Sequence, residues 1–438
     1  MVNKNIHKIL LWLLFLSTIG AYAVMALKFP IAYIWATYED LYGEWTQFYL
    51  FLAALLFSIS NAMRFSRYRR FFILLALACF YTVMEEISWG QRVFQVTSPE
   101  LFKSHNLQGE MNFHNFLVGP YHTQLKVVIE YLLAAALTGY GFIYPLLIHL
   151  RFRPVIWLER HGLASPPLYL APLFLLTSYL ELEPFSFNEA EVAELLVGIA
   201  MAIMALHYAF ALKKNLDIHN SLNWGHGDSF RLALCMVVTI ILVVLASTVT
   251  TQLLYASPER RVQIDNRIEN GIKKFAGRYT RYKLWDKAVM LYTEYYKLKP
   301  NSTSRLRSLA KAHRRAGNLK LHELYLDKAL QIALKRYKKN PNSSSNNRSL
   351  ALIYRMLGNK EKEQLHIKKA LKLGLVRIER KPDSAAAAFS LGKTYKIMGN
   401  QIKALEFFKR AYELEPTRSR YRKAYLRQKT MLHQRKDN

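Results

Sequence analysis

Residues 391–416 read LGKTYKIMGNQIKALEFFKRAYELEP, and the fold of the second half of the chain can be inferred from this stretch. Its apolar residues recur every three or four positions on both sides of Gly399-Asn400, which is the pattern of two amphipathic helices joined by a tight turn. Gly399 suits the left-handed end of the first helix, and Pro416 stops the second. The stretch therefore predicts one helical hairpin.

The same hairpin pattern recurs upstream at an interval of 41 residues. Gly-Asn pairs begin at Gly317, Gly358 and Gly399, and three prolines have the same spacing: Pro300, Pro341 and Pro382. A fixed period of this length is typical of a solenoid, in which each hairpin stacks on its neighbours. We therefore predict an array of hairpins over residues 269–416, followed by a basic capping helix or tail over residues 417–438.

These hairpins resemble tetratricopeptide repeats. The last one carries most of the signature of that family: Leu391, Gly392, Tyr395, Ala404, Phe408, Ala411 and Pro416. Earlier units match it with longer second helices, for example through Ala310 and Ala329 or through Ala351 and Ala370. The resemblance covers about a third of the chain. It implies a concave surface that binds a protein or peptide, without naming the partner.

Charge divides the chain near residue 256. Residues 1–255 hold 16 Lys and Arg and 16 Asp and Glu, whereas residues 256–438 hold 45 and 15, so the whole net charge of +30 belongs to the second part. Such a field favours an anionic partner, such as lipid headgroups, an acidic glycan or an acidic protein. The alternative is a solvated surface that keeps the array soluble. Binding to nucleic acid would rest on charge alone.

The first 255 residues contain seven apolar segments. They run over residues 9–27, 46–63, 71–88, 125–148, 167–182, 192–212 and 231–255. Most approach the ~20 residues that a helix needs to cross a bilayer. The segment 167–182 is the shortest and contains Pro172, so it is a tilted span, a re-entrant piece or an interfacial helix. The predicted fold is all-α: a bundle of about seven transmembrane helices (1–255), a juxtamembrane linker (256–268) and the tetratricopeptide-like solenoid.

Basic residues predict the orientation of this bundle. The N-terminus and the connections at 62–70, 149–166 and 212–230 together hold 11 Lys and Arg. The positive-inside rule places these segments in the cytoplasm. We therefore expect a multi-pass protein of the bacterial inner membrane with its N-terminus in the cytoplasm. Seven spans put the array in the periplasm, and loss of the short fifth segment would reverse that placement.

The polar residues best suited to catalysis or substrate binding lie between residues 85 and 115. Glu85 and Glu86 end the third apolar segment, and His114 follows within thirty residues. We predict these three as catalytic groups, with either Glu as a general base or metal ligand, because a desolvated carboxylate has a pKa suited to proton transfer. The candidate substrate-binding residues around them are Gln91, Arg92, Gln108, Glu110, Asn112 and Asn115. On one continuous helix Glu85, Trp89 and Arg92 would share a face.

The same residues have a structural alternative, in which the helix has reached the headgroups and Trp89 is an interfacial anchor. Residues 85–92 (EEISWGQR) and 108–115 (QGEMNFHN) are also similar to a family of uncharacterised bacterial membrane proteins with an EEISWGQR...QGExNxHN segment. That resemblance implies a shared site without giving its chemistry. It identifies no metal and no cofactor.

Other polar residues favour structural interpretations. Glu130 and His207 lie in apolar segments and could complete a site, although a hydrogen bond between helices is the commoner role. Glu181, Glu183, Glu189, Glu191 and Glu194 are interpreted as an acidic outer loop, and His219 and His226 as loop residues. Glu39-Asp40 is weakly similar to the acidic pair of lipid-linked-sugar glycosyltransferases. No nucleotide-binding, zinc-protease or serine-hydrolase motif is present.

Two functions follow as hypotheses. The first is an integral membrane adaptor whose basic array binds an envelope protein or an anionic glycan or lipid. The second is a membrane-embedded enzyme that acts on a lipid or a lipid-linked glycan through Glu85, Glu86 and His114.

Overall fold

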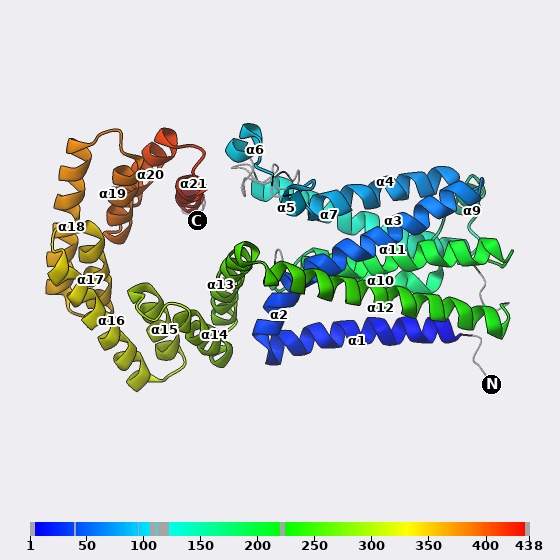
Figure 1. Cartoon of the computed structure of the whole chain (residues 1–438), viewed down its shortest axis with the longest axis horizontal. Helices are drawn as coiled ribbons and strands as arrows, with labels where there is room; N and C mark the ends of the chain where they lie inside the picture. The colour runs from blue at the N-terminus through cyan, green and yellow to red at the C-terminus, as the bar shows by residue number, and fades with distance from the viewer. Residues whose placement is uncertain are drawn as a thin grey trace. The chain divides into compact units, whose positions relative to one another are not determined.

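The computed structural model describes residues 5–38, 41–94, 96–105, 111, 122–219 and 224–433. Regular structure in these residues is entirely helical, which confirms the predicted all-α class (Figure 1). The chain forms two compact units: unit 1 takes its described residues from 1–97 and 121–271, and unit 2 from 98–120 and 272–438. Their boundary falls inside helix α13 (Pro258–Arg281), so the segment 256–268, expected as a linker, is largely helical.

Unit 1 is a bundle in which each of the seven apolar segments forms helix. The long helix α11 (Glu189–Lys213) is the most buried and packs against α3 (Tyr42–Arg64) and α10 (Ala171–Glu181). The remaining elements are α1 (Ile6–Lys28), α2 (Pro30–Thr37), α4 (Arg69–Glu86), α5 (Gln91–Phe94), α7 (His122–Thr138), the π-helical turn η1 (Gly139–Ile143), α8 (Tyr144–His149), α9 (Arg153–Arg160), the short η2 (Leu168–Leu170) and α12 (His226–Ala256).

Five stretches of the described residues are long and apolar enough to cross a membrane. They are Ile6–Lys28, Pro30–Arg64, Val127–His149, Glu189–Lys213 and His226–Ala256. The expected count of about seven is therefore not confirmed. Helix α4 carries charged residues at both ends, and the stretch Leu168–Glu181 is shorter than a full span. Pro172 lies in the first turn of α10, where its missing N–H costs no helical hydrogen bond.

Long-range contacts show which connections share an end of the bundle. Glu159, which precedes α10, contacts both Arg67 in the α3–α4 connection and His219 in the α11–α12 connection. At the opposite end, Asn188 in the α10–α11 connection donates to the carbonyl of Thr37 in α2. Helix α10 therefore links the two ends despite its shortness. The three basic connections lie together, and His7 near the N-terminus stacks on Trp224 at the same end.

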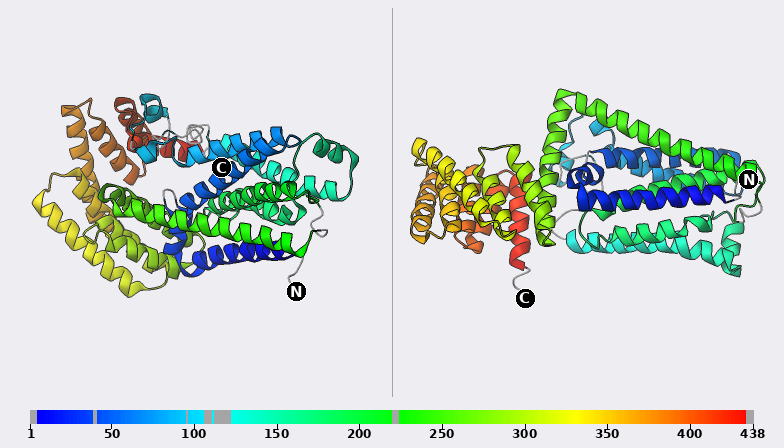
Figure 2. Two further views of the ribbon diagram at one scale, coloured as in Figure 1. Left: turned by 45° about the vertical axis from the view of Figure 1, so that its right-hand side comes forward. Right: turned by 90° about the horizontal axis from the view of Figure 1, so that it is seen from below.

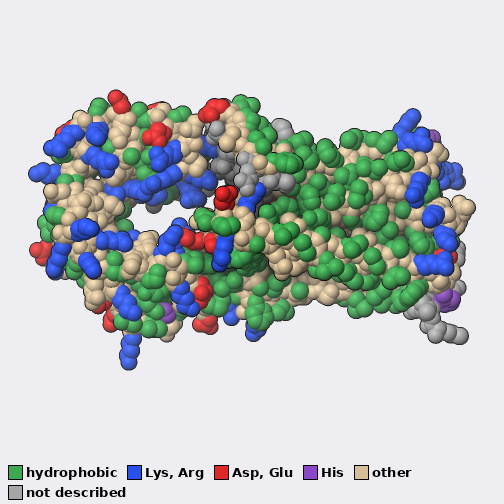
Figure 3. All heavy atoms as spheres, viewed as in Figure 1, with side chains coloured by type: hydrophobic (Ala, Val, Ile, Leu, Met, Phe, Trp, Pro, Cys, Tyr) green, Lys and Arg blue, Asp and Glu red, His purple; other side chains and the backbone are tan. Residues whose placement is uncertain are grey.

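The outer surface of unit 1 is apolar along its length. Figure 3 shows hydrophobic side chains covering the visible side of the bundle, with Lys and Arg gathered at one end. Large side chains on several helices are more than half exposed, among them Leu16, Leu56, Leu74, Leu132 and Leu253. A continuous apolar surface of this extent is unusual for a protein dissolved in water.

Unit 2 is an array of antiparallel helical hairpins (Figure 2). The end of α13 precedes α14 (Trp285–Lys297), and the hairpins then pair α15 (Thr303–Arg315) with α16 (Leu319–Lys339), α17 (Ser344–Met356) with α18 (Lys360–Arg380), and α19 (Ala385–Ile397) with α20 (Gln401–Leu414). Helix α21 (Ser419–His433) follows, and unit 2 also includes the short α6 (Glu100–His105). The second helices have 21, 21 and 14 residues, which agrees with the longer period of the earlier units.

The hairpin turns have the conformation that the sequence predicts. Gly317, Gly358 and Gly399 have φ values of 82°, 76° and 85°, in the region that glycine adopts most easily. A Cβ on Gly392 would lie 2.8 Å from the Phe408 ring, so this glycine allows the close approach of α19 and α20. The backbone and the packing of the last hairpin therefore match the interpretation of residues 391–416.

A pair of stacked rings joins the two helices of each hairpin. The pairs are His313–Tyr325, Tyr354–His366 and Tyr395–Phe407, with ring centroids 5.3, 5.7 and 5.5 Å apart and interplanar angles of 13°, 8° and 14°. Corresponding members of successive pairs are 41 residues apart. The period thus repeats an interhelical contact as well as a turn.

Candidate functional site

The chain makes an unusual turn directly after α4, within the predicted catalytic segment. Ser88, Trp89 and Gly90 are consecutive and have φ values of 48°, 52° and 85°. Two of these are non-glycine residues in the left-handed region, which is costly and is retained where surrounding contacts hold it. The amide of Trp89 donates to the carbonyl of Met84 at 2.7 Å, and its indole Nε1 donates to Glu85 Oε1 at 2.6 Å.

This turn corrects one expectation. Glu85, Trp89 and Arg92 do not share the face of a continuous helix, because α4 ends at Glu86 and α5 begins at Gln91. The left-handed residues between them interrupt the helix instead. Glu85 is buried, with 7% of its surface exposed, and the indole hydrogen bond supports its carboxylate. A buried carboxylate with one indole partner fits both interpretations of Glu85, the structural one and the catalytic one.

Glu86 faces α3 at the same end of the bundle. It lines a small hollow with Glu44, Trp45 and Phe48, where the C-terminal end of α4 meets the first turns of α3. Two carboxylates that line one hollow favour the approach of a cation. Both carboxylates also make further polar interactions within the chain.

Most of the other predicted site residues lie outside the described residues. These are His114, Gln108, Glu110, Asn112 and Asn115, and the pair Glu39-Asp40 has the same status. Gln91 lies at the start of α5, and for Arg92 only the helical backbone is described. Among the described part of the chain, no group of three or more His, Cys, Asp or Glu is placed to hold a metal ion.

His207 lies far from Glu85 and does not complete this site. It is fully buried near the end of α11, where Nδ1 lies 2.9 Å from the Tyr169 hydroxyl and Nε2 lies 3.1 Å from the carbonyl of Ile218. That is the end opposite the turn after α4, because Tyr208 contacts Tyr68 just before α4 begins. His207 therefore has the structural role of joining helices. Glu130 lies half-buried in α7.

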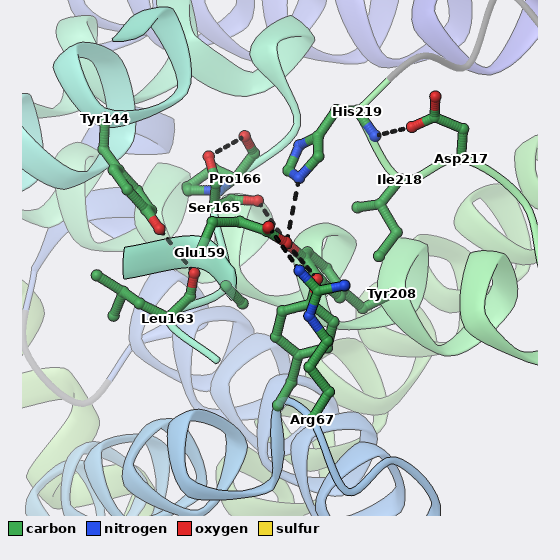
Figure 4. A network of polar contacts seen from close by, with 12 residues as sticks. Arg67, Tyr144, Glu159, Leu163, Ser165, Pro166, Tyr208, Asp217, Ile218 and His219 are labelled. Atoms are coloured by element: carbon green, nitrogen blue, oxygen red, sulfur yellow. Dashed lines mark hydrogen bonds and ion pairs between the residues drawn. The ribbon is translucent and has the colours of Figure 1, made fainter. Parts of the chain in front are cut away.

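A polar network that the sequence pattern does not predict surrounds Glu159 (Figure 4). Arg67 Nη2 lies 2.7 Å from Glu159 Oε2, the Tyr68 hydroxyl donates to Oε1, and His219 Nε2 lies 3.5 Å from Oε1. Burial acts to raise the pKa of Glu159, but the hydrogen bonds from His219 and Tyr68 and the charge of Arg67 outweigh burial and lower it. His219, interpreted from sequence as an ordinary loop residue, thus takes part in joining three connections.

Three tyrosine hydroxyls hold the segment that follows Glu159. Tyr144 donates to the carbonyl of Leu163 at 2.7 Å, Tyr140 to Ala164 at 3.0 Å, and Tyr208 to Ser165 at 2.9 Å. These carbonyls are consecutive and belong to no regular element, so without the hydroxyls they would lack partners in a largely buried place. These three hydrogen bonds fix the start of α10, so the role of the tyrosines is structural.

The acidic residues of the α10–α11 connection also have structural partners. Glu189 accepts hydrogen bonds from the backbone amides of Phe185 and Phe187 at 2.7 and 2.6 Å, which closes the turn before α11. Gln47 Nε2 donates to the carbonyl of Glu191 at 2.6 Å. The interpretation of the five acidic residues as a loop is therefore wrong for four of them: Glu181 ends α10, and Glu189, Glu191 and Glu194 lie in α11, which leaves Glu183 in the connection.

No family model and no curated protein matches this chain. Solved structures to which the chain is similar include the MamA protein, which is 20% identical over 37% of this chain and 81% of that one, with a TM-score of 0.16. The thermophilic TPR protein TTC0263 of Thermus thermophilus is 22% identical over 43% of this chain and 95% of that one, with a TM-score of 0.20. Human IFIT1, solved as a dimer with m7Gppp-AAAA, is 14% identical over 87% and 96%, with a TM-score of 0.18. Similarities at this level carry no argument about partner or activity.

Proposed function

We propose that this chain is a membrane-anchored adaptor whose helical array binds an anionic partner. The observation that carries the proposal is the charge of the array, in which 45 Lys and Arg face 15 Asp and Glu in residues 256–438. The 15 carboxylates of the same residues can neutralise only a third of these cations. An array of hairpins has an extended surface, so these charges can attract an elongated partner along much of its length.

The membrane anchor is the second part of this proposal. The exposed apolar surface of unit 1 and its five long apolar helices are suited to lipid, where every backbone polar group is satisfied inside a helix. The basic connections and the N-terminus share one end of the bundle, and α12 ends at the other. By the positive-inside rule the array leaves the bundle on the outer side, which is the periplasm if the membrane is a bacterial inner membrane.

Affinity capture tests the adaptor. The full chain is purified from cells in detergent without cross-linking and compared with a variant in which exposed lysines of the array are replaced by glutamine. We expect an acidic partner that the wild-type chain recovers at low salt, that is lost at high salt, and that the variant does not recover. Recovery of the same proteins by both chains would overturn the proposal.

A membrane-embedded enzyme is the second candidate, and the turn after α4 favours it. Buried Glu85, its indole partner Trp89 and the left-handed residues around them form the kind of strained polar setting found at active sites. Glu85→Gln keeps the size and a hydrogen-bonding oxygen of the side chain but removes its charge. A phenotype lost with Glu85→Gln while the chain still localises and captures its partner supports an enzyme, whereas an unchanged phenotype supports the adaptor.

A further inference from the structure

The inner helices of the array bring three cations together near Phe389. Arg348 belongs to α17, Lys393 to α19 and Arg420 to α21. The ammonium of Lys393 lies 4.4 Å from the centroid of the Phe389 ring, and the guanidinium of Arg420 lies 4.6 Å from the same centroid. Figure 3 shows Lys and Arg side chains gathered on this part of the array. The three groups come from three helices, and the charges of Arg348 and Arg420 both act on Lys393.

Arg348 is held in position through one of its nitrogens. The two hydrogens of its Nη1 are shared among four oxygens: Ser344 Oγ at 2.8 Å, the carbonyl and Oγ of Ser390 at 3.1 and 3.0 Å, and Thr394 Oγ1 at 3.1 Å. Among the described residues, Nε and Nη2 have no such partner. A guanidinium anchored in this way presents a fixed pair of donors, which matches two oxygens of an oxyanion.

The charges at this place are not neutralised within the described chain. No carboxylate there pairs with Arg348, Lys393 or Arg420. Burial lowers the pKa of Lys393 to about 8, and the charges of Arg420 and Arg348 act in the same direction. Burial also lowers the pKa of Arg348, to about 10. Holding like charges close together costs electrostatic free energy. With no carboxylate to offset this repulsion, the arrangement indicates an anionic ligand that does so.

We propose that Arg348, Lys393 and Arg420 form a binding site for a phosphate-class oxyanion, either free or carried on a lipid headgroup. This inference rests on the proposed function, since it names the chemistry that the array recognises. Three cations around one point match a group with two or three negative charges better than a single carboxylate. The fixed fork of Arg348 supplies two hydrogen bonds, and Lys393 and Arg420 supply the remaining charge.

The array contains its own control. Arg307 lies one period before Arg348, in α15, and its pKa is also lowered by burial. Its Nε donates to the carbonyl of Thr303, and no neighbouring cation contributes to its pKa. Arg307→Gln therefore removes the same charge at the same position of a repeat without touching the proposed site.

Calorimetric titration of the full chain in detergent with inorganic pyrophosphate tests the site. We expect Arg348→Gln and Arg420→Gln each to weaken binding by about tenfold or more, the scale of one charge-assisted hydrogen bond, while Arg307→Gln leaves it within about twofold. At pH 8, titration in two buffers of different ionisation enthalpy should show that the wild-type chain takes up more protons per bound pyrophosphate than Lys393→Arg does, because a bound anion raises the pKa of Lys393 whereas ionisation of pyrophosphate contributes equally to both. Lys393→Arg should keep the binding.

Four further outcomes complete the test. Dihexanoyl phosphatidic acid that binds at least as tightly as inorganic phosphate, with the same dependence on Arg420, supports a lipid headgroup as the source. Equal losses in Arg307→Gln and Arg348→Gln, or a pentaglutamate peptide that binds more tightly than pyrophosphate, would overturn the site. Arg420 is exposed, so its variant folds even if Arg348→Gln does not. If the wild-type chain does not bind pyrophosphate but still captures a partner, this inference is refuted and the proposed adaptor function is retained.

Discussion

At the scale of single residues, two glycines show that the backbone conformation of a position and the space for a side chain there are separate properties. Gly399 has a φ of 85°, and a Cβ built there would meet no atom within 4 Å. Gly277 lies within the helical residues of α13, and its added Cβ would also meet nothing within that distance. The two positions differ in backbone conformation, and neither has a neighbour that a Cβ would meet. Substitution by alanine therefore measures the effect of backbone conformation without a steric clash.

Gly399→Ala is predicted to destabilise the α19–α20 hairpin by about 1 kcal/mol, because the left-handed conformation is unfavourable for alanine. Gly277→Ala is predicted to stabilise its helix by up to about 1 kcal/mol, because alanine loses less backbone entropy. Hydrogen exchange of backbone amides in the full chain measures both local opening free energies. Changes of the same sign at the two positions would contradict the argument.

At the scale of elements, the ring pairs give the array a dependence on pH. His313 and His366 are each stacked on a tyrosine, and burial lowers the pKa of both below the ordinary value of histidine. Nearby positive charges act in the same direction: a neighbouring histidine for His313, and Lys369 and Lys362 for His366. The folded array thus favours neutral rings, while the unfolded chain binds protons more readily.

The sign of the effect follows from this difference. Above the unfolded pKa of about 6.5 both states are neutral and stability is constant; as the pH falls below that value the unfolded state takes up protons first and stability declines. The double variant His313→Tyr, His366→Phe copies residues found one period later and should lose most of the decline between about pH 7 and pH 5. Hydrogen exchange of α15–α18, corrected for intrinsic rates, measures it. An equal decline in both proteins would contradict the prediction.

The π-helical turn η1 provides a second test between elements. A Cβ on Gly141 would lie 2.0 Å from Cγ of Phe174, so the turn in η1 and the start of α10 approach each other without room for a side chain. Gly141→Ala is predicted to cost about 1–3 kcal/mol through overpacking. Phe174→Ala should recover part of that cost when the two changes are combined, which a double-mutant cycle on thermal unfolding in detergent would measure. Strictly additive effects would show that the contact is not the cause.

The sequence was sufficient for features that depend on local pattern. Gly399 and its equivalents could be predicted because a left-handed helix end needs glycine and recurs with the period. The network of Glu159 could not be predicted, because Arg67, Tyr68 and His219 come from connections far apart in sequence. The turn at Ser88 and Trp89 was also missed, since neither residue type signals a left-handed backbone.

At the scale of the whole molecule, the bundle has two chemically distinct ends. The N-terminus and the connections that contain Arg67, Glu159 and His219 lie at one end, whereas α12 finishes at the other, where Tyr255 contacts Trp35. The basic side chains at the first end would remain in the cytoplasm during insertion. This arrangement does not depend on whether α10 counts as a full span.

The chain is therefore predicted to place its termini on opposite sides of a membrane. Fusions of a fluorescent protein that folds only in the cytoplasm and of a phosphatase that is active only outside it, each at the C-terminus, should give phosphatase activity alone. A cysteine placed at residue 2 should resist an impermeant thiol reagent in intact cells. Fluorescence from the C-terminal fusion, or release of the chain from membranes without detergent, would exclude the proposed topology.

The 41-residue period has a genetic consequence. Pro300, Pro341 and Pro382 stand at equivalent places, and each begins a segment with the same turn and the same stacked pair. Recombination between two such places would delete or duplicate one module and rejoin backbone that already fits. The reach of the array could thus lengthen or shorten in single steps over generations, while the rest of the gene stays unaltered.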